Sequence, residues 1–268
     1  MFPKILHIYG PIWINSYGFM IAIGFILFLY LTISHPLRKK LVSKSDFLDA
    51  LFVGLVCGVI GGRLLFVFEN LNSFKSNWLE CFYPWIGGFS ILGTIIGILI
   101  VMPIYLRSRK IAVFPFLDLC SIYAPLLQSI SRIGCFLAGC CYGQACTTLK
   151  WAIVYKNHNC LAPLNIALHP TQLYSSLASF SIFLIIRFIV SKKAKISGQI
   201  VFSYLLLESL ARFTVDFWRG DRDFINLGIK SLKNIFTFYQ LIAVILFLIS
   251  VFVLVLISIK GKRNSDNL

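Results

Sequence analysis

Three arginines of this 268-residue chain lie inside or at the edges of strongly apolar segments: Arg63, Arg132 and Arg212. An isolated charge in the middle of a bilayer costs about 2.5–3.5 kcal/mol on insertion scales, so such residues must face an acid, a wet cavity or a ligand. All three are expected near the outward ends of their segments. A guanidinium fork binds two oxygens of one phosphate and stays charged at any working pH. Three such groups converging on one anion predict a site for a phospholipid headgroup.

Ion pairing is the structural alternative, with Asp118, Asp216 and Glu69 as the acids. The stretch RFTVDFWRG (212–220) places Arg212 and Asp216 four residues apart, which are neighbouring positions on one helix face. A pair there is compatible with a ligand site, because the acid can hold the arginine in one rotamer while its fork points elsewhere.

A thiol-rich turn follows Arg132 in the stretch SRIGCFLAGCCYG (131–143). If this turn lies outside the membrane, disulfides can persist there, although the sequence does not give their connectivity. Zinc binding by the pattern C-x4-C-C-x4-C is a second interpretation, with a spacing that is not a standard ligand pattern. A catalytic thiol is a third. Six of the eight cysteines are expected on the outward side: Cys81, Cys135, Cys140, Cys141, Cys146 and Cys160.

The composition identifies an integral membrane protein. Hydrophobic residues make up 58% of the chain and charged residues 13%, with a mean hydropathy of +0.84, whereas soluble domains are about a quarter charged. The net charge of +15 does not indicate nucleic-acid binding, because the basic residues fall in short clusters between apolar segments rather than on one face.

The apolar segments predict an all-α, polytopic bundle of seven transmembrane helices. They lie at residues 12–34, 47–68, 86–106, 111–133, 171–190, 198–218 and 236–259, and each is long enough to cross a hydrocarbon core. We expect one integral membrane domain over 1–268. The first helix is expected to stay, since no small-residue cleavage pattern accompanies it.

Orientation follows from four basic clusters that hold 13 of the 25 Lys and Arg residues: RKKLVSK (38–44), RSRK (107–110), SKKAK (191–195) and KGKR (260–263). Seven alternating helices put all four on one side, which is therefore predicted to be cytoplasmic. The N-terminus is then outside and the C-terminus cytoplasmic. Residues 134–170, long for a helix connection, are predicted to form a small extracytoplasmic cap.

Several motifs occur in an order that resembles the prolipoprotein diacylglyceryl transferases over nearly the whole chain. INSYGFMIAIGF (14–25) and GGR (61–63) are similar to the family's first two helices, and WIGGFSILGTIIGIL (85–99) to its W-D-G-G-x-S-x-H-G-G segment. SRIGCFLAGCCYG resembles the signature G-R-x-G-N-F-x-N-x-E-x-x-G. HPTQLY (169–174) and RFTVDFWR (212–219) match H-P-x-Q-L-Y and R-F-x-x-E-F-x-R.

This resemblance implies a bacterial inner-membrane enzyme that moves a diacylglyceryl group from phosphatidylglycerol to the lipobox cysteine of a prolipoprotein signal peptide. A thioether forms and glycerol phosphate leaves. Cations must neutralise the phosphate leaving group, and the thiol must lose its proton. Its expected partners are phosphatidylglycerol, prolipoprotein signal peptides and membrane lipid, with no nucleic acid, metal or soluble cofactor. The implied catalytic residues are Arg132, Arg212, Asp216, His169 and Tyr17, and the implied phosphatidylglycerol-binding residues are Arg132, Arg63, Arg212, Arg219 and Gln172.

The chain departs from the family pattern at several polar positions. Leu92 stands in place of the family's histidine, and a leucine neither takes up a proton nor donates a hydrogen bond. Cys135 and Ala138 replace the two asparagines of the signature, and a cysteine of the 140–141 pair replaces its glutamate. His169 is the nearest substitute for the missing base, with a capping or interface role as an equal alternative.

These departures keep a second function in view, a phospholipid-binding homologue without transferase activity that serves as a carrier or chaperone. The arginines are compatible with both functions. A transporter for an anionic solute is a third hypothesis, supported by the charges within the apolar segments alone.

Overall fold

The computed structural model describes residues 2–9, 12–74, 78–82, 88–220, 222 and 236–265. The chain divides into two compact units, one formed by Met1–Ser34 with Leu117–Leu268 and the other by His35–Phe116. Each unit is described by itself.

Within the described residues, five helical spans are long and apolar enough to cross a membrane. Two further helices fall in predicted segments: α5 (Ile91–Ser108), which is short, and α9 (Gln199–Asp216), which carries three charged residues. The membrane bundle is therefore confirmed, whereas the count of seven spans is not. The five spans are α1 (Ser16–Ser34), α3 (Lys44–Glu69), α6 (Val113–Ala138), the run Thr171–Lys193 and most of α10 (Phe238–Ser265). The run comprises α7 (Thr171–Ile185), a π-helical turn (Ile186–Val190) and α8 (Ser191–Lys193).

Short elements join the long helices. A hairpin of β1 (Lys4–Tyr9) and β2 (Ile12–Asn15) precedes α1, so the first helix begins four residues later than the predicted segment. The unit His35–Phe116 also contains α2 (Pro36–Leu41), α4 (Leu71–Phe74) and a 3-10 helix (Trp78–Phe82).

The unit His35–Phe116 is built on close packing of α3 against α5. A Cβ atom placed on Gly61 or Gly93 would collide with the backbone carbonyl of the other glycine, so the two helices touch backbone to backbone. Small residues at such crossings permit van der Waals packing where lipid supplies no hydrophobic driving force between helices. Ser43 caps α3 by accepting a 3.0 Å hydrogen bond from the Asp46 amide.

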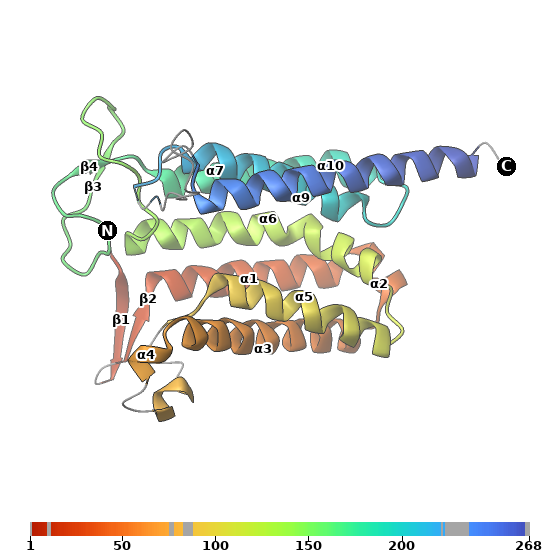
Figure 1. Cartoon of the computed structure of the whole chain (residues 1–268), viewed down its shortest axis with the longest axis horizontal. Helices are drawn as coiled ribbons and strands as arrows, with labels where there is room; N and C mark the ends of the chain where they lie inside the picture. Colours follow the sequence, from red (N-terminus) through yellow and green to blue (C-terminus); the bar gives the residue numbers. More distant parts are fainter. Residues whose placement is uncertain are drawn as a thin grey trace. The chain divides into compact units, whose positions relative to one another are not determined.

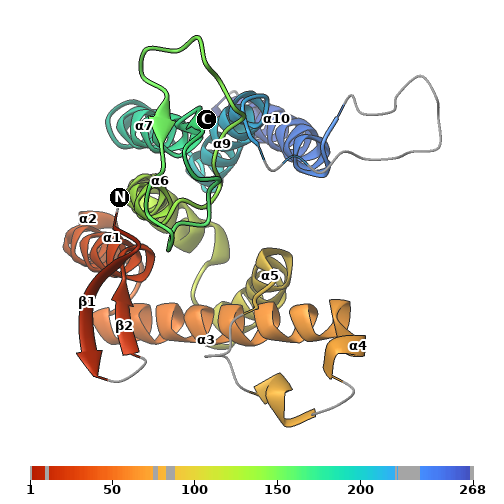
Figure 2. The same ribbon diagram turned by 90° about the vertical axis from the view of Figure 1, so that its left-hand side faces the viewer.

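In the other unit, α6, α7, α9 and α10 run alongside one another, as both the side view and the end view show (Figures 1 and 2). Ser129 of α6 and Ser176 of α7 exchange hydrogen bonds of 2.9 Å between their hydroxyls and backbone carbonyls. Among the described residues, Asp118 forms no ion pair with an arginine, contrary to the ion-pair alternative. Its carboxylate accepts bonds of 2.6 and 2.8 Å from the amides of Gly198 and Val201, and so caps the start of α9.

The segment after α6 folds around a small core of its own. β3 (Ile153–Val154) pairs with β4 (Ala167–Leu168), and Tyr155, 1% exposed, packs with Ala162 and Leu168 beneath them. Gly143 pairs with Arg219 in an isolated bridge, which ties the thiol-rich turn to the end of α9.

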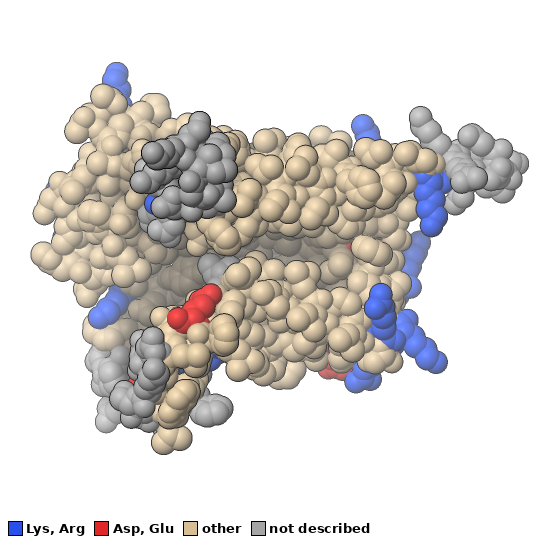
Figure 3. Space-filling model, viewed as in Figure 1, with Lys and Arg blue, Asp and Glu red and all other residues tan. Residues whose placement is uncertain are grey.

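Charged side chains are sparse along the helix flanks. On the face drawn in Figure 3, Lys and Arg atoms gather mainly at the helix ends, and the surface between them is almost uncharged. Many large apolar side chains are exposed there, which is the distribution expected of helices that face lipid.

Candidate functional site

A polar pocket lies between α6, α7 and α9 in the unit that contains the thiol-rich turn. Arg132 enters it from α6, and Glu208 and Arg212 enter it from α9. Ser175 and Ser179 line its α7 side. Two guanidinium groups therefore border one small pocket, and guanidinium groups bind anionic oxygens.

Arg132 lies inside α6 rather than at its end. The helix continues to Ala138, five residues past the predicted end, because apolar residues extend beyond the arginine. Among the residues that the structure describes, the Arg132 guanidinium has no hydrogen bond or ion pair, although the residue is partly buried. Its donors are therefore available to a ligand.

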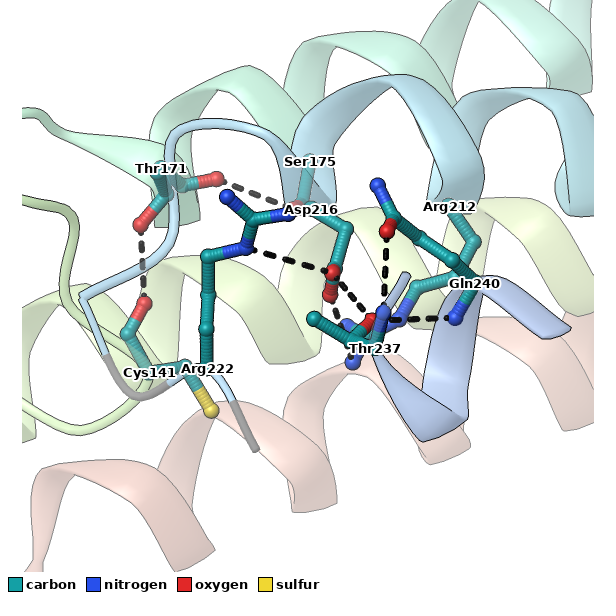
Figure 4. Close-up of polar contacts among 8 residues, drawn as sticks. All are labelled: Cys141, Thr171, Ser175, Arg212, Asp216, Arg222, Thr237 and Gln240. Atoms are coloured by element: carbon teal, nitrogen blue, oxygen red, sulfur yellow. Dashed lines mark hydrogen bonds and ion pairs between the residues drawn. The ribbon is translucent and has the colours of Figure 1, made fainter. Parts of the chain in front are cut away.

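Arg212 is held by neighbours instead. Its Nη2 lies 3.8 Å from Oδ1 of Asp216, the pair that the four-residue spacing predicts, and its guanidinium stacks over the Tyr239 ring at 4.8 Å. Figure 4 shows Asp216 at the centre of this group. It also accepts a 2.6 Å hydrogen bond from the Thr237 hydroxyl and lies 3.9 Å from Nε of Arg222. With 2% exposure, this carboxylate orients cations rather than facing a substrate.

A hydrogen-bonded chain of three side chains borders the same pocket. Tyr204 donates a 3.0 Å bond to Gln128, whose amide in turn donates to Oε1 of Glu208. The second oxygen of Glu208 is buried and has no hydrogen-bond partner within the part of the chain that the structure describes. Both Arg132 and Arg212 lie within electrostatic range of this carboxylate, so it balances part of their charge.

The thiol-rich turn is fixed from α7. The Thr171 hydroxyl donates a 2.9 Å bond to the Cys141 carbonyl, as Figure 4 shows, and the Gln172 amide donates a 2.8 Å bond to the Cys140 carbonyl. Cys141 has a positive φ of 55°, a conformation that a non-glycine residue keeps only where its surroundings impose it. Gln172, predicted to bind lipid, is 1% exposed and holds the turn instead of lining the pocket.

The sulfur atoms of Cys135, Cys140 and Cys141 all lie within 4.8 Å of one another, and all eight cysteines are free thiols. Hydrogen bonds from the other two thiols, together with Arg219 and Arg132, lower the pKa of Cys141. Hydrogen bonds with Cys135 and Cys141, together with burial, raise the pKa of Cys140. The group therefore favours one thiolate, on Cys141.

Tyr17 and Arg219 border this group from two sides. Gly134 of α6 packs against the Tyr17 backbone, since a Cβ atom on Gly134 would lie 3.2 Å from the Cα of Tyr17. The phenol of Tyr17 lies within electrostatic range of Arg132. Arg219 is 8% exposed and lies within electrostatic range of Cys141 and Arg212. The structure thus brings Tyr17, Arg132, Arg212, Asp216 and Arg219 into one region.

His169 lies in a different hollow, lined with Leu149, Trp151, Tyr174 and Trp218. Its Nδ1 is 3.5 Å from the Tyr174 hydroxyl, which accepts a 3.0 Å bond from the Trp151 indole. The imidazole does not cap α7, whose first turn has no side-chain cap. The roles of His169 as a base and as an interface residue stay predictions.

Arg63 belongs to the other unit and is engaged by that unit's own backbone. Its guanidinium donates bonds of 3.0, 2.6 and 3.0 Å to the carbonyls of Cys81, Glu80 and Gly88. The rings of Phe66 and Phe74 lie 5.7 and 5.6 Å from it. Residues 83–87, which include part of the tryptophan motif, lie outside the described residues.

Three site residues were missed by sequence reasoning: Gln128, Thr171 and Thr237. All are uncharged, and nothing in their local sequence distinguishes them from other polar residues in apolar helices. The amide at Gln128, inside a predicted span, is the one signal that a partner was needed, because an unpaired amide is costly in hydrocarbon.

Comparison with known proteins agrees with the motifs. The model of the family described as prolipoprotein diacylglyceryl transferase matches residues 3–256. The chain belongs to this family. A phosphatidylglycerol–prolipoprotein diacylglyceryl transferase of Clostridium tetani is 35% identical over 221 residues, which are 82% of this chain and 86% of that protein. Proteins of the same name from Clostridium perfringens (number 2) and Geobacter sulfurreducens are 30% and 28% identical over 87% and 93% of this chain, and over 89% and 93% of their own lengths.

The signature of the prolipoprotein diacylglyceryl transferase family shows which of its positions the cysteines occupy. Cys135 and one cysteine of the 140–141 pair occur at polar positions of the family signature, and the structure puts all three thiols near the signature arginine, Arg132. Leu92, at the family's histidine position, is 44% exposed near the start of α5.

Proposed function

We propose that this protein transfers a diacylglyceryl group from phosphatidylglycerol to the cysteine thiol of a prolipoprotein, forming a thioether and releasing glycerol phosphate. The observation that carries the proposal is the Arg132 guanidinium, which borders a polar pocket beside Arg212 and has no protein partner among the described residues. A partly buried, unpaired cation is costly unless an anion joins it. The substrates in this proposal are those given in the names of the relatives.

Arg132 is proposed to bind the lipid phosphate and to neutralise the charge that grows on the leaving oxygen as the glyceryl C–O bond breaks. Arg212, held by Asp216, and Arg219 add positive charge at the same place. Such fixed charges help most where water is excluded, as in a membrane-embedded pocket. Asp216 acts on the substrate through the arginines that it orients.

The remaining predicted residues take secondary roles in this proposal. Tyr17, which lies within electrostatic range of Arg132, is proposed to donate a hydrogen bond to a bound headgroup. Gln172 positions the thiol-rich turn, and Arg63 stabilises the loop that follows α3. His169, at its aromatic hollow, is proposed to meet the polypeptide substrate.

The lipobox of a signal peptide is the proposed acceptor, and the bacterial inner membrane is the proposed location, with the N-terminus outside and the C-terminus cytoplasmic. The four basic clusters follow every second predicted span, so they would all lie on one side of the membrane, which supports this orientation. Two acyl chains anchor a protein stably where one gives marginal binding, which gives the reaction its physical purpose.

Complementation of a transferase-depleted bacterium tests the function. The parent chain should restore growth and lipoprotein labelling, and Arg132→Gln should restore neither. Arg107→Gln, in the last turn of α5, is the matched control and should behave as the parent.

The non-catalytic alternative gives a different pattern. A carrier or chaperone would bind phosphatidylglycerol without labelling any lipoprotein, and Arg132→Gln would then change lipid binding alone. The relatives named above are all transferases, which favours the enzyme.

A further inference from the structure

The three thiols beside Arg132 have a spacing that suits a metal ion. Zinc–sulfur bonds of about 2.3 Å at tetrahedral angles place the sulfurs about 3.8 Å apart. The Sγ atoms of Cys135, Cys140 and Cys141 lie within 4.8 Å of one another, about 1 Å from that spacing.

The backbone that carries these thiols is already fixed. Thr171 and Gln172, which are 1% exposed, hold the carbonyls of Cys141 and Cys140, and the Cys140 amide donates a 3.2 Å bond to the Cys135 carbonyl. Metal sites bind tightly when their ligands are held in place by surrounding hydrogen bonds. This turn has that support without a metal present.

Charge at the site also favours bound thiolates. Thiolates, rather than thiols, are the ligands of soft metals. Arg132 and Arg219 lie within electrostatic range of the Cys141 sulfur, and Arg132 also lies within range of Cys135. Three thiolates and one divalent ion carry a net negative charge, which these arginines offset.

The number of ligands indicates an open site. Within the described residues, the group contains three metal-binding side chains and no fourth. Structural zinc sites are closed by four protein ligands, whereas catalytic zinc sites keep one position for water or substrate.

We propose that Cys135, Cys140 and Cys141 bind one thiophilic metal ion of the Zn²⁺ class, and that its fourth position takes the substrate thiol as a thiolate. The second half of this proposal rests on the proposed function. It supplies the thiol activation that Leu92, in place of the family's histidine, does not.

The proposed step is balanced without a redox change. The substrate thiol gives its proton to water as its sulfur joins the metal. The sulfur then attacks the glyceryl carbon, a C–S bond forms, and the C–O bond breaks with its electron pair leaving on glycerol phosphate. The metal keeps its charge and its three protein ligands throughout.

Cobalt titration of the full chain tests the metal site. The protein is purified in detergent under reducing conditions, stripped with a chelator and titrated with Co²⁺. Sulfur-to-cobalt charge-transfer absorption that saturates at a single ion per chain, and that Zn²⁺ displaces, is the expected result. Absence of this absorption overturns the proposal, and so does a disulfide within the group found by mass spectrometry.

Matched variants locate the site. Cys140→Ser and Cys141→Ser should lose the absorption, whereas Cys146→Ser, a thiol outside the group, should keep it. Gln172→Leu leaves all three thiols present and should weaken Co²⁺ binding by about 10- to 100-fold. Full-strength binding in the Cys141→Ser variant contradicts the assignment.

A lipobox peptide tests whether the fourth metal position takes the substrate thiol, independently of the proposed function. Added to the cobalt-loaded protein, the cysteine peptide should shift the absorption, whereas the same peptide with serine should not. If the cysteine and serine peptides change the absorption equally, the proposed open position for the substrate thiol is wrong. This readout does not require transfer activity. A normal shift without any lipidation would therefore contradict the proposed function and still support the metal site.

Discussion

The hydroxyl of Thr237, next to the start of α10, donates a 2.6 Å hydrogen bond to the carboxylate of Asp216 in the last turn of α9. Thr237 is fully buried, and Asp216 is 2% exposed. This bond therefore fixes, from a second helix, the acid that orients Arg212 and Arg222. The position of Arg212 at the pocket depends on both helices.

Thr237→Val removes this bond, together with the 3.1 Å bond that the same hydroxyl accepts from the Gln240 amide, and nearly preserves the shape of the side chain. A hydrogen bond to a charged group contributes about 1.5–3 kcal/mol, so the free energy of unfolding should fall by about that amount. Transfer per folded molecule should fall as well, because Arg212 loses its alignment. Thermal unfolding in detergent and a lipidation assay measure the two effects.

Thr214→Val is the control for this change, since its hydroxyl lies on the exposed side of α9 and bonds the Leu210 carbonyl within the helix. An equal effect of the two substitutions on transfer would show that Asp216 needs no support from α10.

Asp118→Asn tests the cap that joins α6 to α9. The aspartate accepts from two amides with two oxygens, and an asparagine has one carbonyl oxygen to offer. Loss of a helix cap should lower the free energy of unfolding by about 0.5–2 kcal/mol, with transfer per folded molecule unchanged. Chemical denaturation measures it. Asp49→Asn, on an exposed face of α3, should be neutral, and neutrality at Asp118 would refute the cap.

The contrast between Arg212 and Asp118 shows how far the sequence reaches. The Arg212–Asp216 pair was predictable because four residues of helix determine it. An ion pair was the structural alternative for Asp118, but its partners are amides some 80 residues away, and no local pattern specifies such a contact. The helices themselves follow from apolar length, since the bilayer sets that length.

Arg63 shows the same limit in another way. Its charge inside an apolar segment predicted a polar partner, and the structure supplies three backbone carbonyls. Carbonyls belong to every residue, so composition does not reveal which loop will satisfy an arginine. The sequence located the unusual side chains, and the tertiary contacts decided their roles.

Glu208→Gln should strengthen binding of anionic lipid. The carboxylate lies near Arg132 and Arg212 and offsets their charge, whereas glutamine keeps an oxygen that can accept from Gln128. Removal of one charge at this range is worth on the order of 1 kcal/mol. Binding of phosphatidylglycerol, compared with a zwitterionic lipid, measures the change, and Glu69→Gln at the exposed end of α3 is the control. Weaker binding would mean that Glu208 contacts the lipid favourably.

Alkylation of the metal-free protein should distinguish Cys141 from Cys140. The pKa of Cys141 is lowered by hydrogen bonds from its two neighbouring thiols and by Arg219 and Arg132, so its thiolate persists as the pH falls below the ordinary range of a thiol. The pKa of Cys140 is raised, so that thiol stays protonated and unreactive at the same pH. Iodoacetamide at neutral pH, followed by peptide mass spectrometry, should label Cys141 before Cys140. Added Zn²⁺ should protect it, and preferential labelling of Cys140 would reverse the assignment of the thiolate.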